Sequence, residues 1–347
     1  MRVGYSFWGF LGAGITDTPD GGRSHRRTLI DGINSLGHQI VFLQPNRDLT
    51  QAGEDLRGTY TWELRLPTID VLFLEWRWPI PGRNTTSCGS PGHTCDLHRQ
   101  AELLEHYTRD RRTPTLLWDK DLQLPADHPL RGAAHVTVCE AALHPGPGAT
   151  QLLFPVADTA LECADPVALA ALPRDLPLVY VGNQYDRDEP FDCYFAPVAA
   201  TVGHLVAGKW TDTRRWPHVQ FTGRVPFAEV EQLHRRALAT MLLAPDRLAV
   251  RGQFTQRIFE AALAGCVPIT SAYLRAVEQV VPPELIARDA EQARAVLHSL
   301  AGIAGGPQHA ELIGRCLHHL DPFRLSRQLR VLARLLDQAI SSRGIIR

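Results

Sequence analysis

Strand-like and helix-like segments alternate along the chain, and this alternation limits the fold more than any other sequence feature. In the N-terminal half, apolar runs such as residues 69–76 alternate with segments that carry apolar residues at helical spacing, such as residues 24–37. The run 69–76 is apolar on both faces, which is typical of a central strand in a parallel sheet. Such alternation predicts a parallel sheet with helices on both of its faces.

The same alternation restarts with the strand-like residues 150–158. Further on, residues 195–208 are predicted to form one helix. The fold class is therefore α/β, with two doubly wound Rossmann-like domains at residues 1–155 and 156–325. An amphipathic helix at residues 326–347 follows them and could pack back on the first domain.

The composition is that of a soluble globular protein, because 44% of the 347 residues are apolar and 21% are charged. The formal net charge of −1 gives no reason to expect binding to nucleic acid or to an anionic membrane. The seven cysteines are scattered, which argues against a disulfide framework and favours a cytoplasmic location. No apolar run is long enough to predict a transmembrane helix.

Polar and basic residues follow the expected strands of the second domain. In open parallel sheets, ligands bind beyond the carboxyl ends of the strands. Arginines and helix N-termini at that edge would together bind phosphate groups. Each arginine taken alone is better explained as a solvated surface charge, so the prediction rests on their convergence. The predicted donor-binding residues of this edge are Gly182, Asn183, Arg187, Arg224, Arg247, Gln253, Thr255 and Arg257.

Glu260 has two interpretations. A carboxylate accepts two parallel hydrogen bonds, which suits the neighbouring 2′ and 3′ hydroxyls of a ribose. The alternative is an i,i+3 ion pair with Arg257, worth a few tenths of a kcal/mol on a helix surface.

The segment around Glu260 resembles the donor-binding region of group 1 glycosyltransferases of the GT-B fold. It is most similar to the branch that includes the CgeB-like spore-maturation enzymes. The matching residues of the motif FEA-x-x-x-G-x-P are Phe259, Glu260, Ala261, Gly265 and Pro268. The resemblance covers about residues 178–275 well, and residues 19–42 and 152–158 also resemble family segments, whereas residues 45–135 match no family motif.

This resemblance implies that the second domain binds a nucleoside-diphosphate sugar, such as a UDP-sugar, with Glu260 on the ribose. The first domain would then bind a small-molecule or glycan acceptor. The resemblance implies a retaining enzyme. Many retaining members carry a second glutamate where this chain has Gly252, so inverting transfer stays open as well. The arginines at this edge predict a metal-independent enzyme without a cofactor.

The segment Trp76–His98 is expected to lie at the acceptor site, because it follows a strand end. Aromatic faces stack on sugar rings, and polar side chains hydrogen-bond to hydroxyl groups. The alternative is that the tryptophans pack into the core of the first domain. The acceptor-binding candidates are Trp76, Trp78, Arg83, Asn84, His93 and His98.

Four of the residues in this segment could instead bind zinc: Cys88, His93, Cys95 and His98. Their spacing fits none of the common paired-ligand patterns, so no metal site is predicted. A reactive cysteine pair or a disulfide between Cys88 and Cys95 is the other alternative.

Four further residues are weaker candidates. Asp119 and Glu75 end two strands and could orient or deprotonate an acceptor hydroxyl, and His25 could do the same. A surface ion pair with Lys120 is the alternative for Asp119. Gly12 lies in a glycine-rich loop whose backbone could approach the donor, although a tight turn explains it equally well.

Two other functions share this architecture: a catalytically silent glycan- or nucleotide-binding partner subunit, and a sugar-nucleotide epimerase. An NAD-dependent oxidoreductase is not expected, because the glycines of residues 9–14 do not follow the G-x-G-x-x-G order. The protein could act as a homodimer.

Overall fold

The computed structural model describes residues 1–12 and 23–345, which divide into two compact units. Unit 1 comprises Met1–Gly12, Arg26–Leu153 and the C-terminal helix α13 (Leu325–Ile345). Unit 2 comprises Phe154–Arg324 together with the first residues of helix α1, up to His25. The last helix therefore belongs to unit 1, although it follows unit 2 in the sequence.

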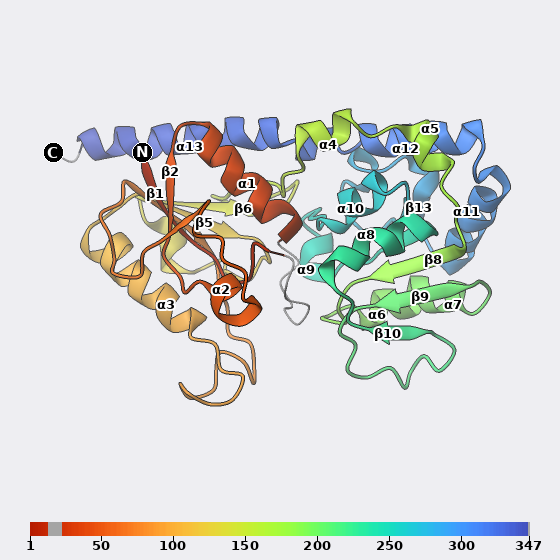
Figure 1. Ribbon diagram of the computed structural model, residues 1–347, viewed down its shortest axis with the longest axis horizontal. Coiled ribbons are helices and arrows are strands. Elements are labelled where there is room, and N and C mark those ends of the chain that lie inside the picture. The colour runs from red at the N-terminus through yellow and green to blue at the C-terminus, as the bar shows by residue number, and fades with distance from the viewer. Residues whose placement is uncertain (13–22, 346–347) are drawn as a thin grey trace. The chain divides into compact units, whose positions relative to one another are not determined.

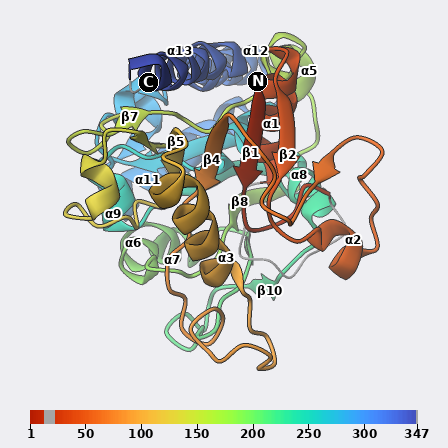
Figure 2. The same ribbon diagram turned by 90° about the vertical axis from the view of Figure 1, so that its left-hand side faces the viewer.

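A parallel sheet forms the centre of unit 1 (Figures 1 and 2). Within the described residues it has seven strands, which in spatial order are β3 (Thr61–Trp62), β2 (Gln39–Phe42), β1 (Arg2–Ser6), β4 (Val71–Glu75), β5 (Thr115–Asp119), β6 (Val136–Glu140) and β7 (Thr150–Gln151). Its helical segments are α1 (Arg23–Ser35), α2 (Arg47–Ala52), α3 (Asp96–Leu103), the π-helix η1 (Leu104–Asp110), the 3-10 helix η2 (Pro129–Gly132) and α13.

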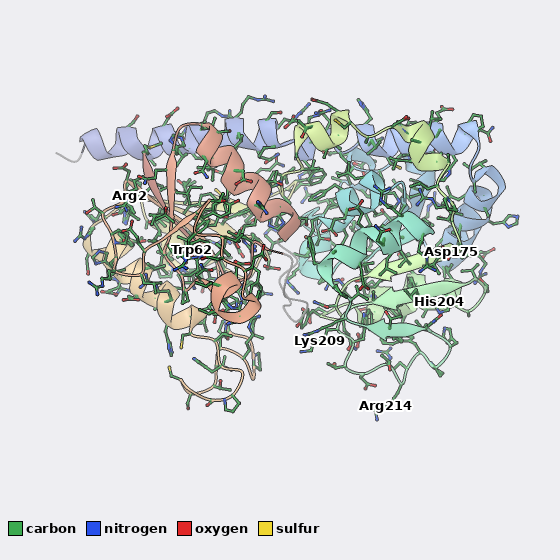
Figure 3. The ribbon with its side chains drawn as sticks, in the orientation of Figure 1. Arg2, Trp62, Asp175, His204, Lys209 and Arg214 are labelled. Carbon is green, nitrogen blue, oxygen red and sulfur yellow. The ribbon has the colours of Figure 1, made fainter. Side chains whose placement is uncertain are left out.

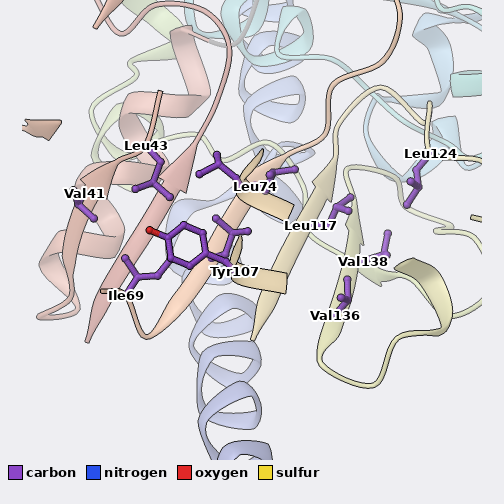
Figure 4. Packing of buried hydrophobic residues seen from close by; sticks show 11 residues of the cluster. Val41, Leu43, Ile69, Leu74, Tyr107, Leu117, Leu124, Val136 and Val138 are labelled. Atoms are coloured by element: carbon purple, nitrogen blue, oxygen red, sulfur yellow. The ribbon is translucent and has the colours of Figure 1, made fainter. Parts of the chain in front are cut away.

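The core of unit 1 forms where α3 and η1 cover apolar side chains of the strands. Leu103 and Tyr107 pack there against residues of β2, β4, β5 and β6, and Figure 4 shows Tyr107 among the side chains of Ile69 and Leu74. Helix α13 packs on α1, where a Cβ on Gly32 would lie 3.0 Å from the side chain of Leu325. This close approach leaves no room for a larger residue at position 32.

Unit 2 is built around a second parallel sheet. In the part of the chain that the structure describes, its strands are, in spatial order, β10 (Phe221–Gly223), β9 (His204–Ala207), β8 (Leu176–Val181), β11 (Ala237–Leu242), β12 (Val267–Ser271) and β13 (Ile286–Ala287). Its α-helices are α4 (Asp158–Glu162), α5 (Pro166–Ala170), α6 (Asp188–Pro190), α7 (Ala196–Ala199), α8 (Phe227–Arg236), α9 (Asp246–Ala249), α10 (Arg257–Leu263), α11 (Ala290–Ile303) and α12 (Pro307–His318). Four short π- or 3-10 helices complete it: η3 (Phe191–Phe195), η4 (Val277–Gln279), η5 (Pro283–Leu285) and η6 (Asp321–Phe323).

Helices cover both faces of this second sheet. Val230 of α8 and Ala261 of α10 pack against Val179 and Val181 of β8, and α8 runs alongside β8 in Figure 1. Helix α11 contacts β11, and it also packs against α7 and η3. The predicted α/β fold class, with parallel sheets covered by helices, is confirmed.

The prediction of one helix over residues 195–208 is wrong, because the helical segment ends at Ala199 and His204–Ala207 form strand β9. The four residues of β9 pair in parallel with β8. A short apolar run suits a buried helix and a buried strand equally well, so only its pairing partner decides between them. None of the described helices combines the length and apolar character that a membrane-spanning helix needs.

Candidate functional site

Each sheet has one point where the strand order reverses. In unit 2 the chain passes from β8 outward to β9 and β10, and then returns to β11 on the other side of β8. In unit 1 the same change of direction lies between β1 and β4. Parallel sheets bind ligands beyond the carboxyl ends of the strands at such points, so the loops after β8, β11, β1 and β4 are the places to look for sites.

The loop after β8 is held by hydrogen bonds from its own polar residues. Asn183 Oδ1 accepts a hydrogen bond from the backbone N–H of Lys209 at 2.8 Å. Lys209 lies just beyond the carboxyl end of β9, which begins at His204 (Figure 3). Gly182 accepts a bond from the indole of Trp210 at 2.9 Å. A Cβ on Gly208 would lie 2.0 Å from the carbonyl oxygen of Gly182, so the two loops meet backbone to backbone.

Arg187 ties this loop to the end of β11. Its Nε donates to the carbonyl oxygen of Leu243 at 3.3 Å, and its Nη1 donates to that of Tyr185 at 2.8 Å. Burial raises the pKa of Tyr180, whereas the positive charges of Arg187 and Arg257 lower it. The charges of these two predicted residues therefore act on the same phenol.

Arg247 follows β11 and pairs with Asp186, the residue before Arg187, at 2.5 Å between Nη1 and Oδ2. Asp186 adopts a left-handed backbone conformation with φ of 50°, which non-glycine residues seldom adopt. Arg247 keeps part of its side chain exposed.

Glu260 lies on the first turn of α10 with only 11% of its side chain exposed. One of its oxygens forms an ion pair with Arg257, as the structural interpretation expects. The other oxygen accepts a hydrogen bond from the hydroxyl of Ser24 at 2.6 Å, and Ser24 also belongs to unit 2. The carboxylate thus already binds one hydroxyl group, which is the chemistry that a ribose would use.

His234 of α8 lies close to this carboxylate. Burial lowers its pKa to about 4; the charge of Glu260 opposes this shift, and that of Arg257 adds to it. The imidazole is therefore neutral at physiological pH, and the sequence analysis did not single it out.

The other predicted donor residues are less clearly placed. Gln253 is buried, and its backbone N–H donates to Leu248. Thr255 precedes α10 and its carbonyl oxygen accepts the N–H of Ile258, while Arg224 directly follows β10. These contacts place the residues at the expected edge of the sheet but leave their role in donor binding untested.

Gly12 belongs to unit 1, and its backbone N–H is already used. It donates to Asp48 Oδ1 at 2.8 Å, and the N–H of Leu11 donates to the same carboxylate. A Cβ on Gly12 would clash with the carboxylate of Glu54. The glycine therefore allows close approach by acidic side chains of its own unit, and the predicted approach of this loop to the donor stays untested.

Asp119 does not form the surface ion pair with Lys120 that the sequence allowed. It is fully buried, and its two oxygens accept the N–H groups of Gln123 at 2.9 Å and Leu124 at 2.8 Å. Burial raises its pKa to about 6, and the two backbone bonds oppose that shift. This geometry gives Asp119 a structural role in the loop after β5 and leaves its predicted catalytic role without support.

Glu75 is the centre of a buried ion network at the end of β4. It accepts bonds from Tyr5 Oη and from Arg26 Nε and Nη2, each at 2.9 Å, and it forms an ion pair with Lys120 at 2.6 Å. These donors engage both oxygens of the carboxylate. These contacts give Glu75 a structural role and leave its predicted catalytic role untested.

His25 is also buried, with its ring 4.3 Å from that of Phe154. These contacts do not test its predicted catalytic role. The glycines at positions 21 and 22 that precede it lie outside the described residues.

A pocket in unit 1 lies beyond the carboxyl ends of β1, β2 and β4, where the sequence analysis named only Glu75. Its lining includes Ser6, Trp8, Gln44, Glu75, Arg77 and Asp96. Gln44 Oε1 accepts the N–H of Phe7 at 3.3 Å, while its buried Nε2 has no partner in the described part of the chain. Trp8 and Gln44 could have been found from the sequence, since each lies two residues after the end of its strand.

The structure separates the predicted acceptor residues into different roles. Trp76 packs against the core of unit 1, so the core-packing alternative holds for it. Trp78 lies under the guanidinium of Arg77 at 5.1 Å, and Arg83 lies 5.9 Å from the ring of Trp8, which lines the pocket.

Asn84 is buried and shapes the loop from within. It accepts the N–H of Ile80 at 2.6 Å and donates to the carbonyl oxygen of Trp78 at 3.0 Å. Its amide is therefore engaged within the protein, and these bonds give no support to the prediction that it binds an acceptor.

His93 and His98 form a cluster with Cys88 and Cys95. The four side chains each offer one ligand atom, and these atoms lie within 4.8 Å of one another. Both cysteines are free thiols. In the part of the chain that the structure describes, these four side chains lie close enough together to hold a metal ion.

Solved glycosyltransferases share the fold of this chain. The T4 phage beta-glucosyltransferase BGT in complex with UDP and Mn²⁺ matches with a TM-score of 0.65 and 11% identity, over 97% of this chain and 100% of that chain. AviGT4, a glycosyltransferase involved in avilamycin A biosynthesis, matches with a TM-score of 0.60 and 15% identity, over 98% of each chain. Anabaena HepE in complex with UDP-glucose matches with a TM-score of 0.56 and 11% identity, over 97% of this chain and 100% of that chain.

The chain has the GT-B fold. No protein-family model matches it, and no curated protein does. At identities this low, structural similarity establishes a fold but not an activity. The narrower CgeB-like assignment of this GT-B chain is not confirmed.

Proposed function

We propose that this GT-B protein is a glycosyltransferase that takes a sugar from a nucleoside-diphosphate sugar. The observation that carries the proposal is the grouping of Arg187, Arg257 and Glu260 at the strand-order reversal of unit 2. Cationic groups there suit a diphosphate, and a carboxylate that already accepts a hydroxyl suits a ribose. The group lies where ligands of doubly wound sheets bind.

The arginines would act mainly on the leaving group. As the bond between the sugar and the diphosphate breaks, negative charge develops on the diphosphate, and fixed positive charges stabilise it. In the absence of a ligand, Arg247 is paired with Asp186 and Arg257 with Glu260. These pairs hold the guanidinium groups in place before the donor binds, which reduces the entropy that binding would cost.

The donor that we propose is a UDP-sugar. Support comes from BGT, which was solved with UDP and Mn²⁺, and from HepE, which was solved with UDP-glucose. For the present chain we propose transfer that needs no divalent metal at the diphosphate, because arginines supply positive charge at this edge. Retaining and inverting outcomes both remain compatible with the residues around Gly252.

The acceptor that we propose is a small molecule or a glycan bound by unit 1. Gln44, whose Nε2 is buried without a partner in the described part of the chain, offers a hydrogen-bond donor beyond the strand ends of this unit. One structural neighbour is a DNA-modifying beta-glucosyltransferase. The net charge of −1 of the present chain gives no electrostatic support for a nucleic-acid acceptor.

A panel of nucleoside-diphosphate sugars tests the proposal. A donor at 100 times its dissociation constant stabilises the folded protein by about 2.7 kcal/mol, which a thermal-shift measurement detects. Release of UDP is then followed with and without candidate acceptors. Donor binding without any release would indicate a silent binding protein, conversion of the donor alone would indicate an epimerase, and no binding by any member of the panel would refute the proposal.

A further inference from the structure

The long connection between β4 and α3 contains a group of side chains that donor and acceptor binding leave unexplained. Cys88, His93, Cys95 and His98 each place one ligand atom within 4.8 Å of the other three. We propose that these four side chains bind one Zn²⁺ ion. The site lies entirely in unit 1 and is separate from the proposed diphosphate site of unit 2.

The donor set selects the metal. Two thiolates and two imidazoles are soft or borderline ligands, which disfavours Mg²⁺ and Ca²⁺ and favours Zn²⁺. With Zn–S bonds near 2.3 Å and Zn–N bonds near 2.0–2.1 Å, tetrahedral coordination places ligand atoms about 3.3–3.8 Å apart. Cys88 Sγ and His98 Nδ1 are already 3.2 Å apart. Contraction of the widest spacing by about 1 Å would complete the tetrahedron, and rotation of these side chains, three of which are exposed, can supply it.

The hydrogen bonds of His93 indicate which ring nitrogen would bind. Its Nδ1 lies 3.0 Å from the hydroxyl oxygen of Thr86. Its Nε2 is buried and has no partner in the described part of the chain. When Nδ1 carries the ring proton and donates a hydrogen bond to the Thr86 hydroxyl oxygen, Nε2 is unprotonated. Its lone pair is then available, as a metal-binding histidine requires. A metal ion would satisfy a buried polar atom that is otherwise costly to leave unpaired.

The local structure explains how an unusual spacing can still form a site. Cys95 immediately precedes α3 and His98 lies in its first turn, so the two point from the same side of the helix. Gly89 and Gly92 have φ values of 84° and 75°. These left-handed glycines turn the chain back on itself between Cys88 and His93, which brings the second pair of ligands beside the first.

A disulfide between Cys88 and Cys95 explains the cluster less well. Both thiols are free in the structure, and a disulfide would leave the buried Nε2 of His93 without a partner. Zinc also accounts for His93 and His98, which the sequence analysis assigned to the acceptor. The ion would fasten residues 76–95 to α3, and this segment carries Arg77, which lines the pocket. Loops of this length rarely keep one conformation unless something ties them down.

Metal analysis of the full-length protein, purified under reducing conditions, tests the site. We expect one zinc per chain by elemental analysis. Replacement by Co²⁺ should give a thiolate-to-metal charge-transfer band together with the visible bands of tetrahedral Co²⁺. The proposal would be overturned by failure to retain zinc after equilibration with excess Zn²⁺, by a cobalt spectrum without thiolate character, or by a Cys88–Cys95 disulfide in the reduced preparation.

Variants locate the ion. The double change Cys88→Ser and Cys95→Ser should abolish stoichiometric zinc binding, whereas Cys163→Ser with Cys193→Ser, which changes two exposed cysteines of unit 2, should keep it. Thr86→Val should weaken zinc binding about tenfold to a hundredfold, because it removes the partner that orients His93. Equal zinc loss in both double variants would refute the assignment. If the first double variant does not fold, the cobalt spectrum of the unaltered protein and the Thr86→Val titration decide the question.

Discussion

At the scale of single residues, the same side-chain type has different roles according to its partners. Glu75, Asp119 and Glu260 are all acidic residues close to strand or helix ends, and all three are largely shielded from solvent. Glu75 is enclosed by cationic donors, and Asp119 by backbone N–H groups. Only Glu260 combines partial exposure with a hydroxyl partner, which makes it the carboxylate that suits a ligand.

The change Glu260→Gln is expected to weaken donor binding and leave the fold intact. An amide keeps the shape but replaces one acceptor oxygen with a donor, so one charge-assisted bond, worth about 1.5–3 kcal/mol, is lost. Donor affinity should therefore fall about tenfold to a hundredfold, as measured by titration calorimetry. Arg235→Gln, which removes the charge of an exposed i,i+4 pair on α8, serves as a control. An unchanged affinity with a lower melting temperature would favour the purely structural ion pair.

The buried carboxyl of Asp119 should make folding less stable as the pH rises. Its pKa is about 6 in the folded protein, against 3.8 for an aspartate in an unfolded chain. Between these two pH values the folded state keeps a proton that the unfolded state has lost. The contribution of this group to the free energy of unfolding is complete below about pH 4 and is lost as the pH rises through 6. At 1.36 kcal/mol per pKa unit, the total loss is about 3 kcal/mol.

Denaturant unfolding at a series of pH values checks this expectation. Asp119→Asn cannot titrate, so its stability should fall less than that of the unaltered protein between pH 4 and pH 7. Asp110→Asn changes an exposed carboxylate of η1 and should leave the pH dependence as it is. Parallel curves for all three proteins would mean that Asp119 is not protonated in the folded state.

At the scale of elements, the ends of the strands in unit 2 depend on close backbone contact. Gly208 follows β9 with φ of 144°, and an added Cβ would lie 2.0 Å from the carbonyl oxygen of Gly182. Gly223 ends β10 with φ of 74° and has open space around it. The two glycines are joined by a backbone hydrogen bond of 2.8 Å, so they provide a matched pair for substitution.

Gly208→Ala should destabilise unit 2 more than Gly223→Ala does. Gly223→Ala adds only the left-handed backbone strain of about 1–2 kcal/mol. Gly208→Ala adds a steric clash with backbone as well, so its cost should exceed that value and should weaken donor binding by displacing Gly182. Unfolding midpoints at unchanged denaturant slope measure the difference. Equal costs for the two variants would show that the loop after β8 moves freely to accommodate a methyl group.

At the scale of the whole molecule, two metal questions must be kept apart. The proposed transfer uses arginines at the diphosphate, whereas the proposed zinc is bound by the loop of unit 1. We expect transfer to persist without added Mg²⁺ or Mn²⁺ and in the presence of EDTA, provided that zinc stays bound. Activity is measured together with the zinc content of the same sample. Loss of activity at full zinc content, restored by Mg²⁺ or Mn²⁺, would contradict the arginine mechanism.

The cytoplasmic location and the homodimer stay predictions.

The sequence by itself determined the features that depend on local periodicity. Two parallel sheets, the helix–glycine–strand order around Gly265 and the long C-terminal helix follow from apolar spacing, because burial of one face requires that spacing. Only the tertiary structure decided that residues 204–207 are a strand, since their pairing partner is β8. It also decided that Asp119 is enclosed, that Gln44 lies beside Phe7 and that Cys88 meets His98. These facts depend on which side chains the folded chain brings together, and the spacing of residues along the sequence does not contain that information.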